Sequence, residues 1–337
     1  MPMPMPMPDV RSLATDLVAI PSVTRDEGAV GGFVAAWLRE RGWTVTEQEV
    51  TPGRSNVWAR RAGGGVTFST HIDTVPPFIA PRREGARLYG RGSCDAKGIA
   101  AAMIAAAERL VADGEERIDL LFVVGEERGS DGALRANTLP ATSRFLINGE
   151  PTESHVAIGC KGALRVTLRT QGREAHSAYA ELGTSAILPM AALLADIGAL
   201  RLPTDPVLGP STVNVGVIQG GTGANIVPGE CTAELMIRVV GEAEPVKAAV
   251  ERWVAGRAEI TYPSFTPAQR FPEMPGFPAK VFAYTTDASL LTNWGTPLLY
   301  GPGSITVAHT PDEFIDVAEL EAAVDTYVRL ARTLLAA

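Results

Sequence analysis

A nearly unbroken apolar run at residues 118–124, set between two helical patterns, constrains the fold more than any other feature of the chain. Residues 120–124 carry no polar side chain, whereas a strand with one solvated face alternates apolar and polar residues. Apolar residues at helical spacing precede the run at 98–112, and the helix they predict ends before Gly114. A strand covered on both faces and flanked by helices is typical of an α/β domain with a parallel or mixed sheet.

The segments around this run extend the pattern and then change it. Before it, the sequence predicts helices at 9–20 and 26–41, and strands at 44–50, 55–61 and 66–72. From residue 161 the order becomes strand, helix, strand, strand, helix, strand, over 163–171, 184–199, 211–219, 230–240, 243–255 and 257–262. This βαββαβ order describes a small two-layer α+β domain.

Residues near the C-terminus return to the first pattern, with a strand predicted at 296–300 and a closing helix at 316–336. The chain is also close to the length at which a single hydrophobic core stops growing. We therefore expect one α/β domain, formed by residues 9–161 and 271–337, that is interrupted by an inserted domain at 162–270.

Composition limits the classes of partner. The 337 residues carry 30 Lys and Arg against 38 Asp and Glu, a net charge of −8, so the surface would repel nucleic acids and anionic membranes. No apolar stretch is long enough to span a bilayer. Three cysteines without a CxxC pair favour a reducing compartment and predict a cytoplasmic protein. The alternating Met and Pro of residues 1–8 predict a disordered tail without the features of a signal peptide.

His71 and Asp73 follow the strand predicted at 66–72. Because side chains alternate along a strand, both project to the same side at its C-terminal end, where α/β sheets place their sites. The carboxylate could fix the imidazole tautomer that metal binding needs, or it could cap the following loop. The pair alone does not decide between these two interpretations.

The glycine-rich turn at residues 90–98 opens the predicted buried helix. Asp95 replaces the third glycine of GxGxxG and no GK[ST] follows, so both phosphate-binding fingerprints fail. Asp95 could be the N-cap of the helix, or a tight backbone could hold it as a bridge between two cations. Taken alone, the residue favours the N-cap.

Further carboxylates follow apolar strands. Glu126 and Glu127 come directly after the apolar run, where their repulsion and lost solvation require a cation or a proton unless the loop is solvated. Glu150 follows a short apolar strand at 145–147 and could equally be a turn residue before proline. His309 lies in a polar loop, where a lone histidine usually has no special role.

Taken together, these residues suggest a metal centre. The set offers two imidazoles and three carboxylates, from His71, Asp95, Glu127, Glu150 and His309. Nitrogen and oxygen donors without thiolate suit zinc, cobalt or manganese, and a shared aspartate suits two metal ions about 3.5 Å apart.

Five segments of the chain read, in order, HIDTVP, GRGSCDAKG, GEERGS, NGEPT and AHTPDEF. This set resembles the co-catalytic zinc aminoacylase and carboxypeptidase family, which includes acetylornithine deacetylase, succinyl-diaminopimelate desuccinylase and glutamate carboxypeptidase. The resemblance spans His71 to Phe314 and includes the inserted domain. It implies a mixed-sheet, zinc-peptidase-like catalytic domain and an inserted βαββαβ domain that serves as a lid and in dimerisation.

The resemblance also implies a division of the ligands between two Zn²⁺ ions per subunit, or Co²⁺ or Mn²⁺ in their place. Asp95 would bridge the two ions. His71 and Glu150 would bind one ion, and Glu127 and His309 would bind the other.

Three further residues receive catalytic roles from the resemblance. Glu126 would be the general base that takes a proton from the attacking water and delivers it to the leaving amine. Asp73 would orient His71. His176 would reach across a dimer interface and stabilise the oxyanion in the partner's site. Without the resemblance, His176 would be interpreted as a solvated loop histidine.

Candidate substrate contacts come from the same comparison of motifs. Arg238 resembles the family's arginine that binds a substrate α-carboxylate bidentately, although it could be an exposed strand charge. Asn225 lies in the loop 220–228, which resembles the family's substrate-contacting loop. Thr285 and Gly303 are further candidates for contact with the carboxylate.

The function predicted from the sequence is a metal-dependent amidohydrolase that removes an N-acyl group, with acetyl as the leading candidate, from a small amino acid. N-acetylornithine, N-acetyllysine and N-acetylcitrulline are the candidate substrates, in arginine or lysine biosynthesis. Succinyl-diaminopimelate desuccinylase and a dipeptidase or carboxypeptidase remain alternatives. A metal-free binding protein on this fold is the non-enzyme alternative, which the intact ligand set and Glu126 argue against. The expected partner is a second copy of the chain, bound through the inserted domain.

Overall fold

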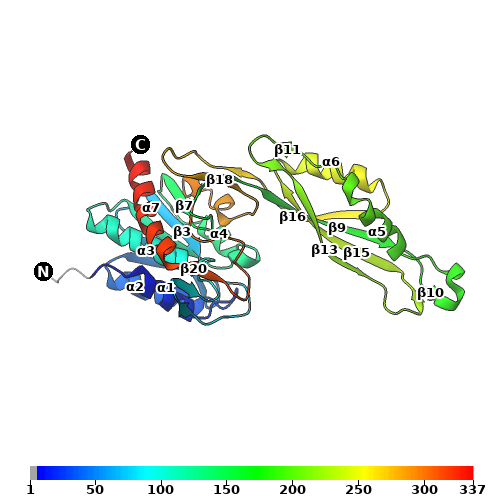
Figure 1. The fold of residues 1–337 in the computed structure, drawn as a ribbon, viewed down its shortest axis with the longest axis horizontal. Helices are drawn as coiled ribbons and strands as arrows, with labels where there is room; N and C mark the ends of the chain where they lie inside the picture. The colour runs from blue at the N-terminus through cyan, green and yellow to red at the C-terminus, as the bar shows by residue number, and fades with distance from the viewer. Residues whose placement is uncertain (1–5, 337) are drawn as a thin grey trace. The chain divides into compact units, whose positions relative to one another are not determined.

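The computed structural model describes residues 6–336 and divides the chain into two compact units (Figure 1). Unit 1 comprises residues up to 158, 271–280 and residues from 286 onwards. Unit 2 comprises 159–270 and 281–285, which encloses the range expected for the inserted domain. The tail expected at residues 1–8 falls mostly outside the described residues.

A six-stranded mixed sheet forms the centre of unit 1 (Figure 1). Its strands, in spatial order, are β1 (Thr44–Thr51), β2 (Arg54–Arg60), β6 (Ile118–Val123), β3 (Val66–His71), β7 (Phe145–Asn148) and β19 (Thr296–Leu299). The β1–β2 and β2–β6 pairs are antiparallel, and the remaining three pairs are parallel. The carboxyl ends of β6, β3 and β7 therefore meet at the same edge of the sheet.

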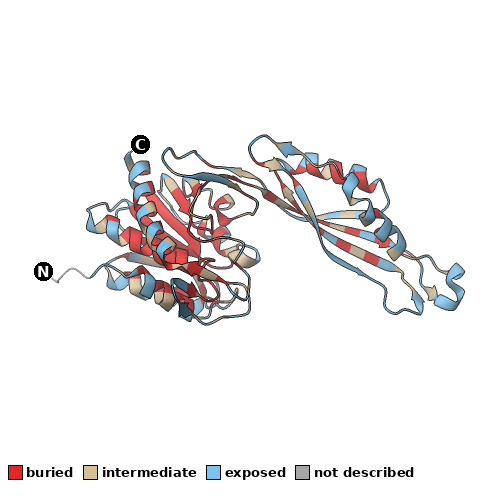
Figure 2. Cartoon of the chain, in the orientation of Figure 1, coloured by how far each residue is buried: buried red, intermediate tan, exposed pale blue. Residues whose placement is uncertain are grey.

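Both faces of this sheet are buried, which explains the apolar run at its centre (Figure 2). Leu120 and Phe122 of β6 pack on the face covered by helices, and Leu121 and Val123 pack on the opposite face with Trp294. The covering helices of the first face are α1 (Val10–Ala19), α2 (Gly28–Glu40), α3 (Lys97–Ala112) and α7 (Val317–Ala336). The opposite face packs against α4 (Asp131–Ala136).

Several short elements have no strong periodic pattern and are not predicted from the sequence. Two three-stranded sheets consist of β4 (Arg82–Glu84), β5 (Arg87–Tyr89) and β20 (Phe314–Asp316), and of β17 (Gln269–Arg270), β8 (Val156–Cys160) and β18 (Ala279–Phe282). Two 3₁₀ turns of unit 1 are η1 (Glu126–Arg128) and η4 (Asp287–Ser289). The turns η1 and η4 carry acidic side chains that matter below.

Unit 2 is a four-stranded antiparallel sheet with helices on one face (Figure 2). Its strands, in spatial order, are β13 (Thr212–Gly220), β15 (Glu230–Val239), β9 (Gly162–Gln171) and β16 (Glu259–Thr266), and its helices are α5 (Ile187–Ala195) and α6 (Ala243–Val254). Its smaller elements are β10 (Ala175–His176), η2 (Ser177–Leu182), η3 (Ile197–Ala199), β11 (Thr204–Asp205), β12 (Gly209–Pro210) and β14 (Ile226–Val227). Strand β13 is an edge strand, and most of its residues are exposed.

The predicted α/β fold class is confirmed, and the boundaries that differ have local causes. The helix expected at 184–199 is only α5, because Pro189 is tolerated only in a first turn and the chain tightens into a 3₁₀ turn around Gly198. The strand expected at 257–262 begins at Glu259 because Gly256 has φ of +76° and holds the chain in a turn. No helix among residues 6–336 is long and apolar enough to cross a bilayer.

Candidate metal centre

Parallel strands bring four of the predicted site residues to one edge of the sheet. His71 is the last residue of β3, Glu126 and Glu127 follow β6 after Gly125, and Glu150 follows β7. Since these three strands are neighbours and run in the same direction, their carboxyl ends lie together. This edge is where open α/β sheets place their sites.

Asp95 lies between the two histidines of this edge. Its Oδ1 is 3.0 Å from His71 Nε2, and its Oδ2 is 3.3 Å from His309 Nε2. The N-cap position of α3 belongs to Ala96, so the interpretation of Asp95 as a helix cap is wrong. Each carboxylate oxygen faces a different imidazole, which is the arrangement expected of a bridging ligand.

Glu127 and Glu150 complete two groups around Asp95. Glu127 Oε1 is 2.9 Å from His309 Nε2, and Glu150 Oε2 is 3.9 Å from His71 Nε2. Ligand atoms of His71, Asp95 and Glu127 all lie within 4.8 Å of one another. Glu150 is buried, and its Oε1 has no hydrogen-bond partner among the described residues. The structure thus brings all five predicted ligands together, with one histidine and one glutamate on each side of Asp95.

This donor set fits a divalent cation. Burial raises the pKa of Glu150 well above its usual range, and hydrogen bonds that the imidazole donates to Asp95 and Glu127 raise the pKa of His309 to about 10. Carboxylates so close together repel one another when all are ionised. Some of them must therefore be protonated, unless a bound cation compensates their negative charge. A bound cation would take the place of those protons, which is the usual linkage between metal binding and titration.

Asp73 supports both the histidine and the two adjacent glutamates. Its Oδ1 accepts the backbone N–H of Glu126 at 3.0 Å, and its Oδ2 accepts that of Glu127 at 3.2 Å and the hydroxyl of Thr24 at 2.8 Å. His71 Nδ1 lies 3.0 Å from the backbone oxygen of Asp73 and 3.4 Å from its Oδ1. A proton on Nδ1 would leave Nε2 free as a ligand.

Glu313 holds the turn that carries Asp95, a role for which the sequence offers no signal beyond its proximity to His309. Its buried carboxylate accepts three backbone N–H groups, those of Gly92, Cys94 and Asp95, at 2.9, 3.1 and 3.1 Å. Arg91 Nη1 donates to the other oxygen of Glu313 at 2.6 Å. The glycine-rich turn is therefore organised around a carboxylate and not around a phosphate.

Glu126 is the acidic residue of the centre that pairs with nothing among the described residues. Burial raises its pKa well above the usual range, and the nearby charge of Asp287 raises it further. Asp287, in η4, is also buried, and neither of its carboxylate oxygens accepts a hydrogen bond of normal geometry. Burial raises the pKa of Asp287 to about 6. Sequence reasoning missed Asp287, although it lies two residues after Thr285.

The candidates in unit 2 fall into two groups. His176 and Asn225 are neighbours, because β10 pairs with β14 and the Ser177 backbone N–H donates to Asn225 O at 2.9 Å. His176 is exposed, and its Nδ1 accepts the backbone N–H of Ala178 at 3.1 Å. Arg238 of β15 is half-buried, and its side chain forms no hydrogen bond or ion pair with another described residue. The roles of these residues stay predictions.

Of the remaining substrate candidates, Thr285 is half-buried and Gly303 has a structural role. Gly303 is buried with φ of +81°, and its backbone N–H donates to Glu319 Oε1 at 2.8 Å, so this donor is not free for a substrate carboxylate. A Cβ at Gly303 would lie 2.6 Å from Cys94 Sγ. Burial raises the pKa of the Cys94 thiol well above its usual range, which makes Cys94 a packing residue and not a reactive thiol.

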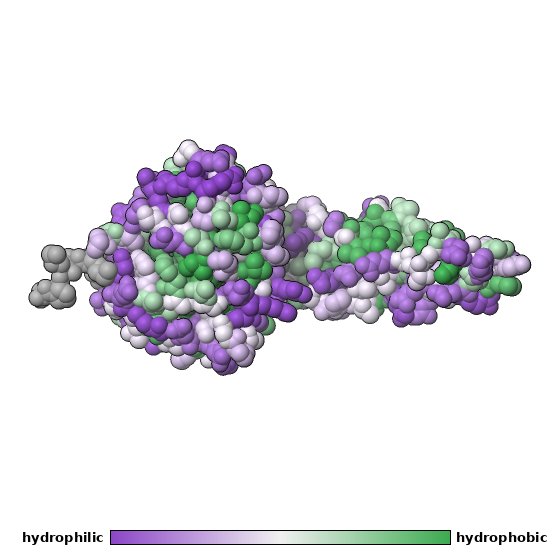
Figure 3. All heavy atoms as spheres, turned by 90° about the horizontal axis from the view of Figure 1, so that it is seen from below, coloured by the Kyte–Doolittle hydropathy of each residue, from purple (hydrophilic) through white to green (hydrophobic). Residues whose placement is uncertain are grey.

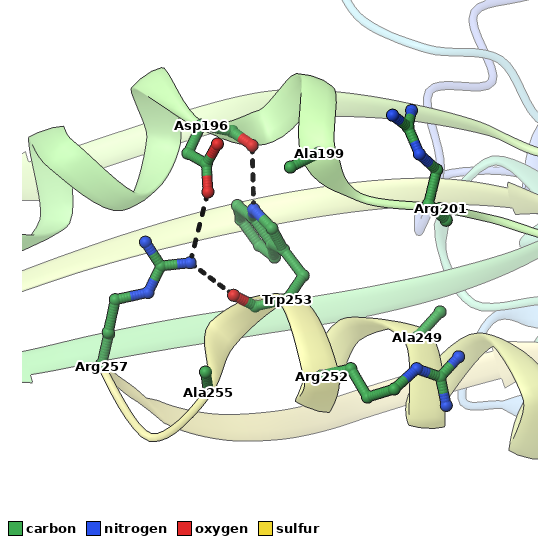
Figure 4. Close-up of a pocket in the computed structure, with 8 residues that line it drawn as sticks. All are labelled: Asp196, Ala199, Arg201, Ala249, Arg252, Trp253, Ala255 and Arg257. Carbon is green, nitrogen blue, oxygen red and sulfur yellow. Dashed lines mark hydrogen bonds and ion pairs between the residues drawn. The ribbon is translucent and has the colours of Figure 1, made fainter.

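A cavity of about 360 Å³ in unit 2 is unrelated to this centre (Figure 4). Its walls come from the end of α5 and from α6, and they include Asp196, Trp253 and Arg257. Trp253 Nε1 donates to Asp196 O at 3.0 Å, and Arg257 donates to the backbone oxygen of Trp253. These contacts join two helix ends. The cavity contains none of the predicted site residues, so the side-chain cluster of unit 1, rather than a cavity, defines the candidate site.

Imidazoles and carboxylates gathered at the carboxyl edge of a mixed sheet, beside an unpaired glutamate, define a metallohydrolase. The chain belongs to the peptidase family M20/M25/M40, whose family model matches residues 67–333. The family expected from the motifs is thereby confirmed at this level. The acetylornithine deacetylase type stays a prediction.

Curated relatives are similar over nearly the whole chain. A peptidase M20 domain-containing protein of Schizosaccharomyces pombe is 37% identical over 95% of this chain and 83% of its own length. A probable carboxypeptidase of Aspergillus clavatus is 36% identical over 94% of this chain and 86% of its own length.

Solved structures share the fold. A tripeptidase from Staphylococcus aureus superposes with a TM-score of 0.82 at 19% identity and covers 98% of this chain and 100% of its own. A dinuclear metal-binding peptidase of the M20 family from Bacillus subtilis superposes with a TM-score of 0.70 at 16% identity, covering 97% and 98% of the two chains. At these identities the likeness concerns the fold.

Proposed function

We propose that this chain hydrolyses the amide bond between an acyl group and an amino acid with a free α-carboxylate, using two divalent metal ions, with zinc as the leading candidate. The observation that carries the proposal is Glu126, a half-buried carboxylate without a partner among the described residues, which follows the same strand as the proposed ligand Glu127. Membership in a metallopeptidase family supports hydrolysis of an amide.

Asp95 would be shared by the two ions. His71 and Glu150 would hold one ion, and Glu127 and His309 would hold the other. This grouping agrees with the distance from Glu150 to His71 and with the distance from Glu127 to His309. When bound, the ions would lower the pKa of a water molecule and polarise the amide carbonyl.

Glu126 would move the proton. A carboxylate held next to the attacking water can take its proton and then deliver it to the nitrogen of the leaving amine. Burial and neighbouring charges raise the pKa of Glu126, which makes it a stronger proton acceptor than an ordinary carboxylate. Asp73 fixes the backbone N–H groups of Glu126 and Glu127, which keeps the base and the ligand in separate positions.

Two substrate classes fit this chemistry. In an N-acyl-amino-acid deacylase, the class favoured by the motifs, the acyl group is small, such as acetyl on ornithine, lysine or citrulline. In a carboxypeptidase or dipeptidase the acyl group is itself an aminoacyl or peptidyl group, and the name of the Aspergillus clavatus relative favours this class. In both classes the leaving group is an amino acid, and Arg238 would bind its carboxylate, with Thr285 as a further candidate contact.

The inserted unit would act in a homodimer. Arg238 pairs with Ala163 at one end of β9, and His176 follows the other end, where Gln171 pairs with Glu230. The eight residue-to-residue steps from Glu230 to Arg238 span roughly 26 Å of extended strand. Arg238 and His176 of one chain therefore cannot reach the same small substrate. This separation supports a site that His176 and Asn225 of a second copy complete.

Exposed apolar side chains on the inserted unit support the same dimer. Val215, Val217 and Ile218 of the edge strand β13 are 37%, 40% and 52% exposed. Figure 3 shows hydrophobic surface on this unit. A second copy that pairs with this edge would bury these side chains and cover the strand edge.

The test combines metal analysis with a matched substrate panel. The purified protein is analysed by emission spectroscopy and assayed with acetyl-, succinyl- and formyl-amino acids and with dipeptides, each beside its α-carboxamide analogue. We expect zinc, loss of hydrolysis on chelation, recovery on adding zinc, and a strong preference for the free carboxylate. The values of kcat/KM decide between the two substrate classes. Substoichiometric metal with no hydrolysis of any substrate would establish the metal-free binding protein instead.

A further inference from the structure

A polar pocket lies at the end of β6 opposite to the metal centre. Asp119 is the second residue of β6, whereas Glu126 and Glu127 follow its other end. The pocket has a volume of about 200 Å³, and its walls include Thr44, Trp58, Arg60, Asp119 and Thr142. A water molecule takes up about 30 Å³ in the liquid, so the pocket has room for a small polar ligand.

The carboxylate of Asp119 at this pocket lacks a partner. Asp119 is 2% exposed, and neither of its side-chain oxygens has a hydrogen-bond partner among the described residues. Trp58 Nε1 and Arg60 Nε are also buried and unpaired. Burial raises the pKa of Asp119 to about 6, against weaker opposing effects of the Trp58 side chain, the Arg60 charge and the backbone N–H of Arg61, none of which forms a hydrogen bond of normal geometry with Asp119. A buried carboxylate without a partner is costly, so its presence points to a ligand or to water.

Arg60 is the expected partner of Asp119 but is held away from it. The two residues lie directly opposite each other on antiparallel strands, where opposite charges normally pair. Instead the Arg60 guanidinium lies over the Trp58 ring, 4.3 Å from its centroid, and forms no ion pair with a described residue. The neighbouring Arg61 is occupied, because its Nη1 and Nη2 donate to backbone oxygens of Gly42 and Arg41. Apart from Arg61, whose guanidinium is occupied, the pocket is therefore lined by one anion and one cation that form no salt bridge with each other.

A ligand with a single charge would satisfy only one side of this pocket. The Asp119 carboxylate would repel an anion, and the Arg60 guanidinium would repel a cation. Cβ atoms of directly opposed residues are about 5 Å apart, so a ligand whose two charges are separated by only two bonds fits between the two side chains. We propose that the pocket binds a free α-amino acid, with its ammonium group at Asp119 and its carboxylate at Arg60.

Such a site would be separate from the metal centre and would recognise the class of molecule that amide hydrolysis releases. The inference itself rests on the pocket alone. The proposed amino-acid site does not depend on whether this chain is a deacylase, a carboxypeptidase or a protein without hydrolytic activity.

The test is isothermal titration of the full chain, with its metal, using glycine as the probe. Acetate and methylammonium carry one charge each and serve as half-ligands. We expect saturable binding of glycine to the wild type and at least tenfold weaker binding of each half-ligand. Asp119→Asn and Arg60→Gln should each weaken this binding at least tenfold. The matched controls Asp113→Asn and Arg332→Gln, which alter an exposed salt bridge, should bind as the wild type does.

Binding of glycine to the metal centre would be common to all five proteins, so the difference between them isolates the pocket at Asp119. Circular dichroism and metal content confirm that each variant is folded, and Arg60→Gln suffices if Asp119→Asn does not fold. A crystal grown with glycine should show the amino acid between Asp119 and Arg60. Ordered water alone in that pocket, or equal binding by wild type and both variants, would overturn the proposal.

Discussion

The partners of each buried carboxylate determine what it can do in this protein. Asp95 faces two imidazoles, and Asp73 accepts backbone N–H groups, so both side chains are fixed in place. The buried Asp119 and the half-buried Glu126 have no hydrogen-bond partner of normal geometry among the described residues and are available for binding or for chemistry. In the proposed mechanism and the proposed amino-acid site, carboxylates would thus act as ligand, support, base or receptor according to their neighbours.

The role of Glu126 can be separated from metal binding. Glu126→Gln removes the proton acceptor but none of the five proposed ligands, so metal content should stay at the wild-type level. We expect kcat to fall by about 10²–10⁴, the usual contribution of a general base. Turnover with the preferred substrate and zinc content are measured together, with the exposed Glu40→Gln as control. Near-normal turnover in Glu126→Gln would remove this residue from the mechanism.

Asp119 gives a pH-dependent prediction about stability. Its pKa is about 6 in the folded protein and 3.8 in a model peptide, so the folded state binds its proton more tightly. Stability should therefore fall as the pH rises from about 4 through 6, by up to about 3 kcal/mol from this group. Asp119→Asn has no such proton to lose. Urea unfolding without amino acids should show the variant gaining on the wild type as the pH rises from about 4 through 6, and parallel curves from pH 4 to 8 would contradict the burial argument.

Single side chains also join the elements that carry the metal centre. Arg54 of β2 donates to both oxygens of Glu27, the residue before α2, at 2.6 and 2.9 Å. Its Nη1 donates to Asp131 at the start of α4 at 2.8 Å. Gly125 leaves room for this network, because a Cβ there would lie 2.0 Å from Asp131 Oδ1. Three elements are thereby held around the loop that presents Glu126 and Glu127.

Loss of Arg54 should loosen this arrangement. The side chains of Arg54 and Glu27 are 8% and 0% exposed, so Arg54→Met leaves a buried carboxylate without its charge partner. We expect a loss of about 3–5 kcal/mol in the free energy of unfolding. Urea denaturation of metal-depleted protein provides the measurement. Arg39→Met, which breaks an exposed ion pair with Glu47, should cost under about 1 kcal/mol. Equal losses in the two variants would show that burial is not the cause.

At the scale of the whole molecule, two units with separate hydrophobic cores share one continuous chain. The proposed metal ligands belong to unit 1, whereas His176, Asn225 and Arg238 belong to unit 2. In the proposed dimer, each site would need residues of both copies. Activity would then depend on assembly as well as on the ligands.

A mixed dimer tests this dependence. His176→Ala should impair turnover without loss of metal, whereas the matched control His155→Ala should not impair it. In a dimer of one His176→Ala chain and one Glu126→Gln chain, one site combines an intact Glu126 with an intact His176 of the other copy. We expect such dimers, isolated with two affinity tags, to recover activity that neither variant has alone. Verified mixed dimers without recovery would count against a shared site.

Local patterns in the sequence are sufficient to predict the α/β class and most long elements. Alternate side chains of the apolar run at 118–124 pack on opposite faces of the sheet, as a doubly covered strand requires. The short sheets and the 3₁₀ turns were missed because they form through contacts with distant segments. β20, for example, exists only because Phe314 pairs with Tyr89.

The sequence by itself determined which residues can bind metal, because donor type and position after a strand are local properties. His71, Asp95, Glu127, Glu150 and His309 could all be named from it. Only the tertiary structure decided how they are supported, since Glu313 reaches the turn at Asp95 from 218 positions along the chain. The same holds for Asp287 beside Glu126 and for the unpaired Asp119. Burial and partnership of a charge depend on which distant segments pack around it, and no local pattern encodes that packing.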